Sequence, residues 1–360
     1  MRVFLCLNRG ELSRTLLLYS LSCAFYFSIN QGYSQTSVRS PVSLPSLNTS
    51  IKKGIDFLSN AQTEWGEFAT YMWNKKNKEF PEYVSSVFIT TFVVHSLNFV
   101  EQSSIIKDMK FKAIQFLQKN MEGVGTWRFF CKGSKIAPDL DDTCCILAIL
   151  KQNNVNVDIK LLDFFLKFRK HKDKLFYTWI GIPNRENDVS PIVNANVLWF
   201  YSLMNRTKKI PEVIDYLNKK SNLLRKKPFK SMWYCSSSAF CYMVTRVYAE
   251  GNIVKLRNSN KSIQQFLCST QKSDGSWGNE LETALSTVSL LNIGYFGSKV
   301  DKAVQFLLSK QDSVEGSWPI APFCKGPEKG VKYFFGSEEL TTAICLEALA
   351  KYKLMRENNG

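Results

Sequence analysis

Phe266-Leu-Cys-Ser-Thr-Gln-Lys-Ser-Asp-Gly-Ser-Trp277 and Phe306-Leu-Leu-Ser-Lys-Gln-Asp-Ser-Val-Glu-Gly-Ser-Trp318 are two copies of one sequence element. Each runs from an aromatic-Leu pair through Gln, Gly and Ser to Trp. Weaker copies end in four further tryptophans, namely Trp65, Trp127, Trp179 and Trp233, and the mean spacing of the six is about 51 residues. The sequence is therefore built from six repeats, which is the first feature to look for when assigning a fold.

Each repeat contains two helical segments separated by a turn that follows the Trp. The first segment is amphipathic and the second is more uniformly apolar, as expected for an outer and an inner helix. The second segments begin near Tyr83, Asp139, Ser190, Ser236, Glu280 and Ser337. A period near 50 residues suits a helical hairpin. We predict an all-α fold over residues 41–360, an (α/α)6 toroid whose six inner helices surround a cavity; an open solenoid is the alternative.

The repeated element resembles the QW motif of the squalene-hopene cyclase and protein prenyltransferase superfamily. Gln271 to Trp277 and Gln311 to Trp318 match it well, and Gln62-Thr-Glu-Trp65 matches it in part. The resemblance covers about residues 50–355. It implies that each Gln caps a helix end and stacks on the Trp, which ties neighbouring repeats together. A Gln amide can satisfy free helix-terminal groups and a Trp buries a large area, so these residues are expected to be scaffold.

An acidic segment, Asp139-Leu-Asp-Asp-Thr143, opens the second inner helix. Since the first turn of a helix stabilises anions, a cap cluster that faces solvent is one interpretation. Within a chain of such repeats, however, the segment resembles the DxDDT motif of class II terpene cyclases. The resemblance implies that Asp141 is the general acid that protonates an alkene or epoxide, with Asp139 and Asp142 as its partners. An ordinary Asp, with a pKa of about 3.9, is ionised at neutral pH, so burial and neighbouring carboxylates must keep one carboxyl protonated.

Two amides on the third inner helix are candidate partners of these aspartates. Hopene cyclases, which the chain resembles, use a His beside the acid, but neither His95 nor His171 lies at a matching helix start. Asn194 and Asn196 stand instead on an otherwise apolar segment, where unsatisfied amides are costly. We expect them to hydrogen-bond the aspartates across the inner ring, with ordinary interhelix bonding as the alternative.

A cyclisation cascade needs a dry cavity lined by aromatic rings, because ring faces stabilise cations. The candidate rings are Trp199, Phe88, Phe92, Tyr242, Tyr333, Phe334 and Phe335. Each of them taken singly is more typical of a hydrophobic core.

Composition and charge limit the classes of partner that the protein can bind. The 360 residues are 45% hydrophobic, and Lys plus Arg exceed Asp plus Glu by 16. This excess favours an anionic partner, either a charged substrate or a membrane surface, and no nucleic-acid-binding signature accompanies it. The densest basic stretch is Arg206–Lys230, which is either a solvated helix face or a rim that attracts anionic groups.

Residues 1–40 have a basic and then an apolar part, as in a signal-like leader; a disordered or misassigned start is the alternative.

The chain has room for one toroid and most resembles the monodomain class II meroterpenoid cyclases. That resemblance implies a linear polyprenyl small-molecule substrate and no cofactor or metal, with Mg²⁺ relevant only to a diphosphate substrate. It favours a cytoplasmic enzyme or one in peripheral contact with a membrane; export is the alternative. The sequence does not indicate the oligomeric state.

Three rival functions stay open. A non-catalytic toroid would bind a lipid or a protein. A prenyltransferase-like subunit would bind zinc through Asp, Cys and His, but the last two repeats contain no His. A glycosidase on an α/α toroid would need paired carboxylates, for which Glu339 and Asp141 are candidates.

Overall fold

The structure of the protein is a computed structural model that describes residues 42–74, 81–183, 186–328 and 331–359. Six largely buried helices form its interior. The predicted leader, residues 1–40, lies outside the described residues. The buried helices are α3 (Val87–Leu97), α5 (Leu140–Gln152), α7 (Pro191–Leu203), α9 (Ser237–Gly251), α11 (Glu280–Asn292) and α13 (Glu338–Asn359). Side chains of residues such as Ser86, Asp139 and Asn279 cap their first turns, which satisfies N–H groups that have no partner within the helix.

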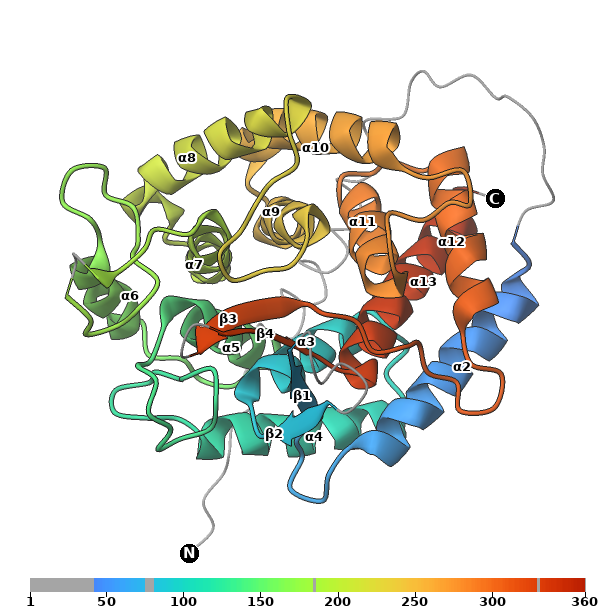
Figure 1. The fold of residues 1–360 in the computed structure, drawn as a ribbon, viewed down its shortest axis with the longest axis horizontal. Helices are drawn as coiled ribbons and strands as arrows, with labels where there is room; N and C mark the ends of the chain where they lie inside the picture. The colour runs from blue at the N-terminus through green and yellow to red at the C-terminus, as the bar shows by residue number, and fades with distance from the viewer. Residues whose placement is uncertain (1–41, 75–80, 184–185, 329–330, 360) are drawn as a thin grey trace, which may run out of the picture. The chain divides into compact units, whose positions relative to one another are not determined.

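Contacts between these helices form a closed cycle (Figure 1). Each helix packs against the next in the order α3, α5, α7, α9, α11, α13, and α13 packs in turn against α3. Asp141, at the start of α5, meets Tyr234 just before α9, and Gln152, at the end of α5, meets Glu250 at the end of α9. Helices α5 and α9 are therefore parallel. The prediction of a mainly helical chain is confirmed.

A second set of helices covers the outside of the cycle, as Figure 1 shows. These are α2 (Leu44–Ala61), α4 (Ser104–Lys119), α6 (Lys160–Phe165), α8 (Pro211–Asn222), α10 (Arg257–Thr270) and α12 (Ser298–Lys310). Each buries one stripe only; in α2 the stripe includes Leu47, Gly54 and Leu58, at the spacing of one helix face. Helix α6 is the shortest and continues into a 3-10 turn, η2 (Leu166–Phe168).

A four-stranded antiparallel sheet is a feature that the all-α prediction did not include. Its strands are β1 (Thr70–Trp73), β2 (Glu82–Val84), β3 (Cys324–Glu328) and β4 (Val331–Gly336), in the order β2-β1-β4-β3. Pairs such as Tyr71 with Gly336 join the first repeat to the last. The predicted cavity residues Tyr333, Phe334 and Phe335 therefore lie on a strand, which aromatic residues favour.

The repeated Gln side chains connect neighbouring outer helices, and the Trp indoles bond to the outer helix of their own repeat. The Nε2 of Gln271 donates to the Lys299 carbonyl, 2.8 Å away in the first turn of α12. The Nε2 of Gln311 donates to the Ser50 carbonyl of α2 at 2.9 Å, so this bond joins the last repeat to the first. The indole N–H of Trp318 donates to the Leu307 carbonyl at 2.8 Å.

Trp65 departs from this pattern. Its side chain is 56% exposed, and its indole N–H donates to the Glu67 carboxylate at 3.0 Å rather than to a helix carbonyl. The Gln in its repeat, Gln62, still donates to the Met109 carbonyl of α4, at 2.9 Å.

Replacing the Gln that joins the two ends of the chain tests how much this contact stabilises the fold. We expect Gln311→Ala to lower the free energy of unfolding by about 1–3 kcal/mol, because the Ser50 and Gly316 carbonyls lose their amide donor. Urea unfolding followed by circular dichroism measures it. The control Gln115→Ala, on the exposed face of α4, should change it by less than about 0.5 kcal/mol. Equal unfolding midpoints for the two variants would contradict the prediction.

Candidate active site

Three carboxyl groups occupy the start of α5. The Asp139 side chain caps the helix by accepting a hydrogen bond from the Asp142 N–H at 2.8 Å. Asp139 and Asp142 are only 3% and 4% exposed, whereas Asp141 keeps partial exposure. The alternative of a cap cluster that faces solvent is therefore wrong for Asp139 and Asp142.

Burial is the main cause that raises the pKa of Asp139 and of Asp142; the charge of Asp141 adds to both, and the charge of Asp139 raises the pKa of Asp142 further. The hydrogen bond between the two side chains lowers the pKa of Asp139 and raises that of Asp142, which lies well above its usual range. Since two adjacent buried carboxylates repel each other, Asp142 is the member of the pair that keeps its proton.

Asp141 accepts one hydrogen bond on each carboxyl oxygen. The Nδ2 of Asn196 donates to its Oδ1 at 2.5 Å, and the hydroxyl of Tyr234 donates to its Oδ2 at 2.7 Å. Burial raises the pKa of Asp141, whereas these two bonds and the nearby Arg246 guanidinium lower it, and the net direction is upward. The site thus shifts Asp141 toward its protonated form and holds two hydrogen-bond donors for its conjugate base.

The two amides predicted as partners behave differently. Asn196, on α7, reaches Asp141 and also accepts from the Nη2 of Arg246 at 2.6 Å. Asn194 does not reach the aspartates. It bonds instead to the backbone of the segment before α7. Its Oδ1 accepts from the Phe176 N–H, and its Nδ2 donates to the Phe176 and Ser190 carbonyls, each at 2.9 Å. Asn194 thus follows the alternative of ordinary structural bonding.

Two residues of this site were missed by the sequence analysis. Tyr234 directly follows the fourth repeat Trp, and Arg246 lies within an otherwise apolar run on α9. A lone charge in such a run was a usable signal, because Arg is almost never fully buried without a role.

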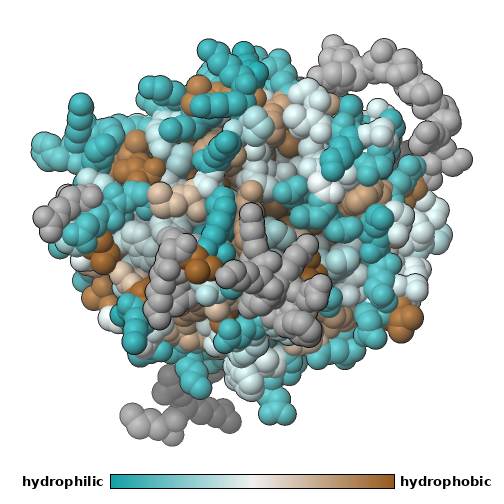
Figure 2. All heavy atoms as spheres, viewed as in Figure 1, coloured by the Kyte–Doolittle hydropathy of each residue, from teal (hydrophilic) through white to brown (hydrophobic). Residues whose placement is uncertain are grey.

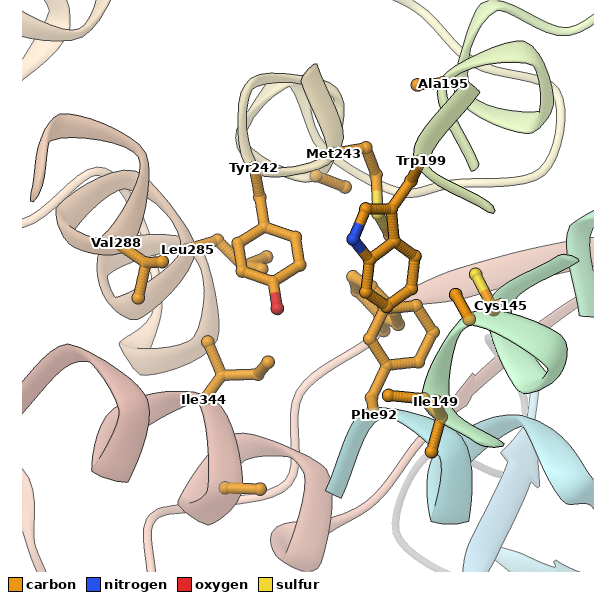
Figure 3. Close-up of a cluster of buried hydrophobic side chains, with 14 of the residues drawn as sticks. Phe92, Cys145, Ile149, Ala195, Trp199, Tyr242, Met243, Leu285, Val288 and Ile344 are labelled. Atoms are coloured by element: carbon orange, nitrogen blue, oxygen red, sulfur yellow. The ribbon is translucent and has the colours of Figure 1, made fainter. Parts of the chain in front are cut away.

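The predicted cavity rings pack against one another. Phe88, Phe92, Trp199 and Phe335 are all buried. Figure 3 shows side chains from all six inner helices pointing into the centre of the ring, among them Phe92, Trp199 and Tyr242. Phe323, just before β3, contacts Phe88 and Phe92 with ring centroids 5.7 and 5.1 Å apart. These side chains fill the space where the sequence predicted a cavity.

The remaining two rings lie on the sheet, away from that centre. Phe334 stacks on Trp73 with centroids 6.4 Å apart, and Tyr333 is half-buried.

Figure 2 shows hydrophobic residues scattered among hydrophilic ones on one face of the molecule. Two surface depressions, of about 370 and 270 Å³, are lined by residues of α2, α12 and the turn at Asp274, and neither includes the aspartates.

A second buried polar cluster lies at the far end of the inner helices, about 16 Å along α5 from Asp141. The Nε2 of His95 contacts Glu250 at 2.9 Å, and its Nδ1 contacts the Tyr242 hydroxyl at 2.9 Å. Lys351 pairs with Glu347 at 2.8 Å. Burial lowers the pKa of His95, but the two glutamates outweigh it and the net direction is upward. His95 is thus placed to be a cation between carboxylates, and it does not touch the aspartates.

The described part of the chain offers no evident metal centre. Outside the gaps at 1–41, 75–80, 184–185, 329–330 and 360, no group of three or more His, Cys, Asp or Glu side chains is arranged to hold an ion. In that same part, no helix combines the length and apolar composition that a membrane span requires.

Neither a protein-family model nor a curated protein sequence matches the chain. Solved structures do. The type II terpene cyclase MstE from Scytonema, in its apo form, is 15% identical with a TM-score of 0.69, covering 87% of this chain and 100% of its own. A variant of MstE in complex with its substrate, geranylgeranyl dihydroxybenzoate, gives a TM-score of 0.67 at 16% identity, covering 87% of this chain and 99% of its own.

Two further structures show how widely the fold is used. The ent-copalyl diphosphate synthase from Streptomyces platensis is 20% identical with a TM-score of 0.57, covering 74% of this chain and 50% of its own. The GH76 α-mannanase BT2949 from Bacteroides thetaiotaomicron is 11% identical with a TM-score of 0.56, covering 87% of this chain and 97% of its own. The fold of this chain is therefore one that it shares with type II terpene cyclases.

Proposed function

We propose that this protein is a class II terpene cyclase built as an (α/α)6 toroid with QW-type repeats. Asp141 of the DLDDT motif protonates the terminal alkene or epoxide of a linear polyprenyl substrate, and the resulting carbocation cyclises until deprotonation ends the cascade. The observation that carries this proposal is the setting of Asp141, a partly exposed acid with one hydrogen-bond donor on each oxygen. The fold shared with MstE, whose structure is known in complex with geranylgeranyl dihydroxybenzoate, supports it.

The chemistry requires an acid that is protonated at neutral pH and still strong. Burial of Asp141 supports the first requirement by raising its pKa. Asn196 and Tyr234 support the second, because hydrogen bonds to a carboxylate stabilise the charge that forms as the proton leaves. The amide donor of Asn196 is in place before the transfer, so little reorganisation is needed on that oxygen.

Asp139 and Asp142 act on Asp141 through charge. Asp142 keeps a proton while Asp139 caps the helix, so the cluster carries fewer than three negative charges. A fully ionised cluster would make Asp141 a weaker acid, since nearby carboxylates raise the pKa of their neighbours.

The aromatic side chains around the acid suit a carbocation. Phe88, Phe92 and Trp199 offer ring faces worth about 0.5–2 kcal/mol each to a cation. Because these rings and Phe323 now fill the centre, substrate must displace some of them to reach Asp141. We propose Phe323 as the ring that moves, since it comes from the segment before β3 rather than from an inner helix.

We also propose that the substrate is drawn from a membrane. Polyprenyl chains partition into lipid, and the basic stretch Arg206–Lys230 lies on the outer helix α8 and the turns beside it, where it can meet anionic headgroups. A cytoplasmic or peripheral location follows from this proposal.

A second candidate is a non-catalytic toroid that binds a lipid or a protein. The packed centre favours it, because the rings around Asp141 leave little accessible surface. In that case the hydrogen bonds from Asn196 and Tyr234 to the two oxygens of Asp141 would serve only to hold the helices together.

Removing the acid separates the two candidates. We expect Asp141→Asn to lower the rate of cyclisation by about a hundredfold or more, the usual contribution of a general acid. Purified protein would be offered farnesyl and geranylgeranyl diphosphates, squalene, oxidosqualene and prenylated dihydroxybenzoates, without metal and then with Mg²⁺. Mass spectrometry detects a product isomeric with its substrate.

The matched control for this variant is Glu280→Gln, in the first turn of α11 on the opposite side of the ring. It removes an acidic side chain from an equivalent helix start and should leave the rate within a factor of about two. Full activity of Asp141→Asn would exclude Asp141 as the acid, and no product from any substrate would favour the non-catalytic candidate.

The pH dependence follows from the direction of the Asp141 pKa. Only the protonated carboxyl donates, so kcat/KM should hold a plateau at low pH and fall as pH rises through the pKa. Because burial raises that pKa, the fall should lie above the value of about 3.9 for a free Asp. Steady-state rates in constant-ionic-strength buffers check it, and a rate that increases through this range would indicate that Asp141 acts as a base.

A further inference from the structure

We propose that Arg246 is a positioning residue that decides which oxygen of Asp141 carries the transferable proton. This inference rests on the proposed function, in which Asp141 is the acid. It concerns a residue outside the acidic motif, which reaches Asp141 through two contacts, one that joins α9 to α7 and one that joins α7 to α5.

The first contact fixes the orientation of an amide. A guanidinium can only donate hydrogen bonds, and the Nη2 of Arg246 lies 2.6 Å from the Oδ1 of Asn196. The reverse amide orientation would place two N–H donors against each other. Arg246 therefore holds the amide oxygen of Asn196 toward itself and the amide nitrogen toward Asp141.

The second contact assigns the two oxygens of Asp141. The Nδ2 of Asn196, 2.5 Å from Oδ1, can only donate. Oδ1 must accept in both protonation states, which leaves Oδ2 as the oxygen that carries the proton. The partner of Oδ2 is the hydroxyl of Tyr234 at 2.7 Å, and a hydroxyl can accept as well as donate.

The proton transfer from Asp141 to the alkene needs no other reactant. Before the transfer, Oδ2–H donates to the Tyr234 oxygen or faces the substrate. During the transfer the Oδ2–H bond breaks and its proton forms a C–H bond at the alkene carbon, whose π electrons supply the pair. Afterwards the carboxylate accepts from Asn196 on Oδ1 and from the Tyr234 hydroxyl on Oδ2.

The surroundings of Arg246 fit a positioning role better than an ion pair. The side chain is 1% exposed, and among the described residues no carboxylate lies within ion-pair distance of it. Its guanidinium stacks 3.8 Å from the Trp199 ring centre, and that indole is held by donating to Glu250 at 3.1 Å. It also lies near the sulfur atoms of Met243 and Cys145 and the rings of Phe92 and Tyr242. Asn196 is thus the strong polar acceptor that this buried cation contacts, and an unpartnered buried charge is costly.

The charged and titratable groups that face Asp141 predict the direction of a pH effect. They are Asp139, Asp142 and Cys145 on α5, Asp188 before α7, Tyr234 before α9, Arg246 on α9 and Cys324 on β3. Arg246 is the cation among them. Its removal should raise the pKa of Asp141, since the remaining groups are acids or neutral.

The test is Arg246→Met with Arg246→Lys beside it. We expect Arg246→Met to lower kcat on the order of tenfold to a hundredfold, the range found for groups that orient the ligands of a metal, with KM nearly unchanged. The fall of kcat/KM with pH should move to higher pH. Arg246→Lys keeps a donor and the charge, so it should recover much of the rate and return the pH profile toward that of the unmodified chain.

The matched control is Lys351→Met, which removes a half-buried cation from the far cluster without touching Asn196. It should lower stability but leave the pH profile of the unmodified chain in place. Infrared difference spectra against Asp141→Asn report the Asp141 carboxyl directly, without substrate. The band should shift in Arg246→Met and stay in Lys351→Met.

The outcomes separate this inference from the proposed function. If the unmodified chain cyclises substrate and Arg246→Met keeps its rate, pH profile and carboxyl band, the role of Arg246 is overturned and the proposed function stands. If the unmodified chain forms no product, the proposed function fails, and an unchanged infrared band would overturn the Arg246 contact chain as well. Should Arg246→Met not fold, Arg246→Lys and Asn196→Leu give the same comparison, with the band expected to shift in Asn196→Leu.

Discussion

Closure of the inner ring is the constraint on which the rest of the structure depends. A helical hairpin cannot bury an inner helix that is apolar on all sides, so each inner helix needs a neighbour on both flanks. The last helix, α13, meets this need by packing against α3, and Gln311 on the outside bonds to Ser50 of the first repeat. The parallel inner helices then bring residues from separate repeats to one end of the ring, where Asp141 receives donors from α7 and from the loop before α9.

Much of the fold and part of the site could be predicted from the sequence. The repeat period predicted the helical hairpins, and the acidic segment with Asn196 predicted a bonded cluster. The sheet was missed because β1 and β4 belong to opposite ends of the chain, so no local pattern relates them. Tyr234 was missed because a Tyr after a Trp is common by itself. Arg246 stands out in its apolar run, but the sequence does not show which residue it faces, and only the ring places it beside Asn196 and Asp141. The packed centre was missed because periodicity shows which residues face inward, not how well they fill the space.

Two polar clusters lie in the largely apolar interior, and most of their donors meet an acceptor; the Nε of Arg246 does not. Buried ion pairs are weak evidence for stability, because desolvation offsets much of their attraction. Their value here is in orientation. His95 between Glu250 and Glu347 holds the C-terminal ends of α3 and α9 against the middle of α13. The Trp199 indole links that cluster to the guanidinium of Arg246.

The bond between Gln311 and Ser50 spans 261 positions of the chain, and this separation has a consequence for synthesis on the ribosome. The flank of α3 that α13 will cover is translated early and stays uncovered until the last repeat emerges. Contacts so distant in sequence are reached slowly, since a long loop must close before they form. The nascent protein therefore passes through an open arc with an apolar edge, and it is in this interval that it depends most on chaperones and is most exposed to association with other chains.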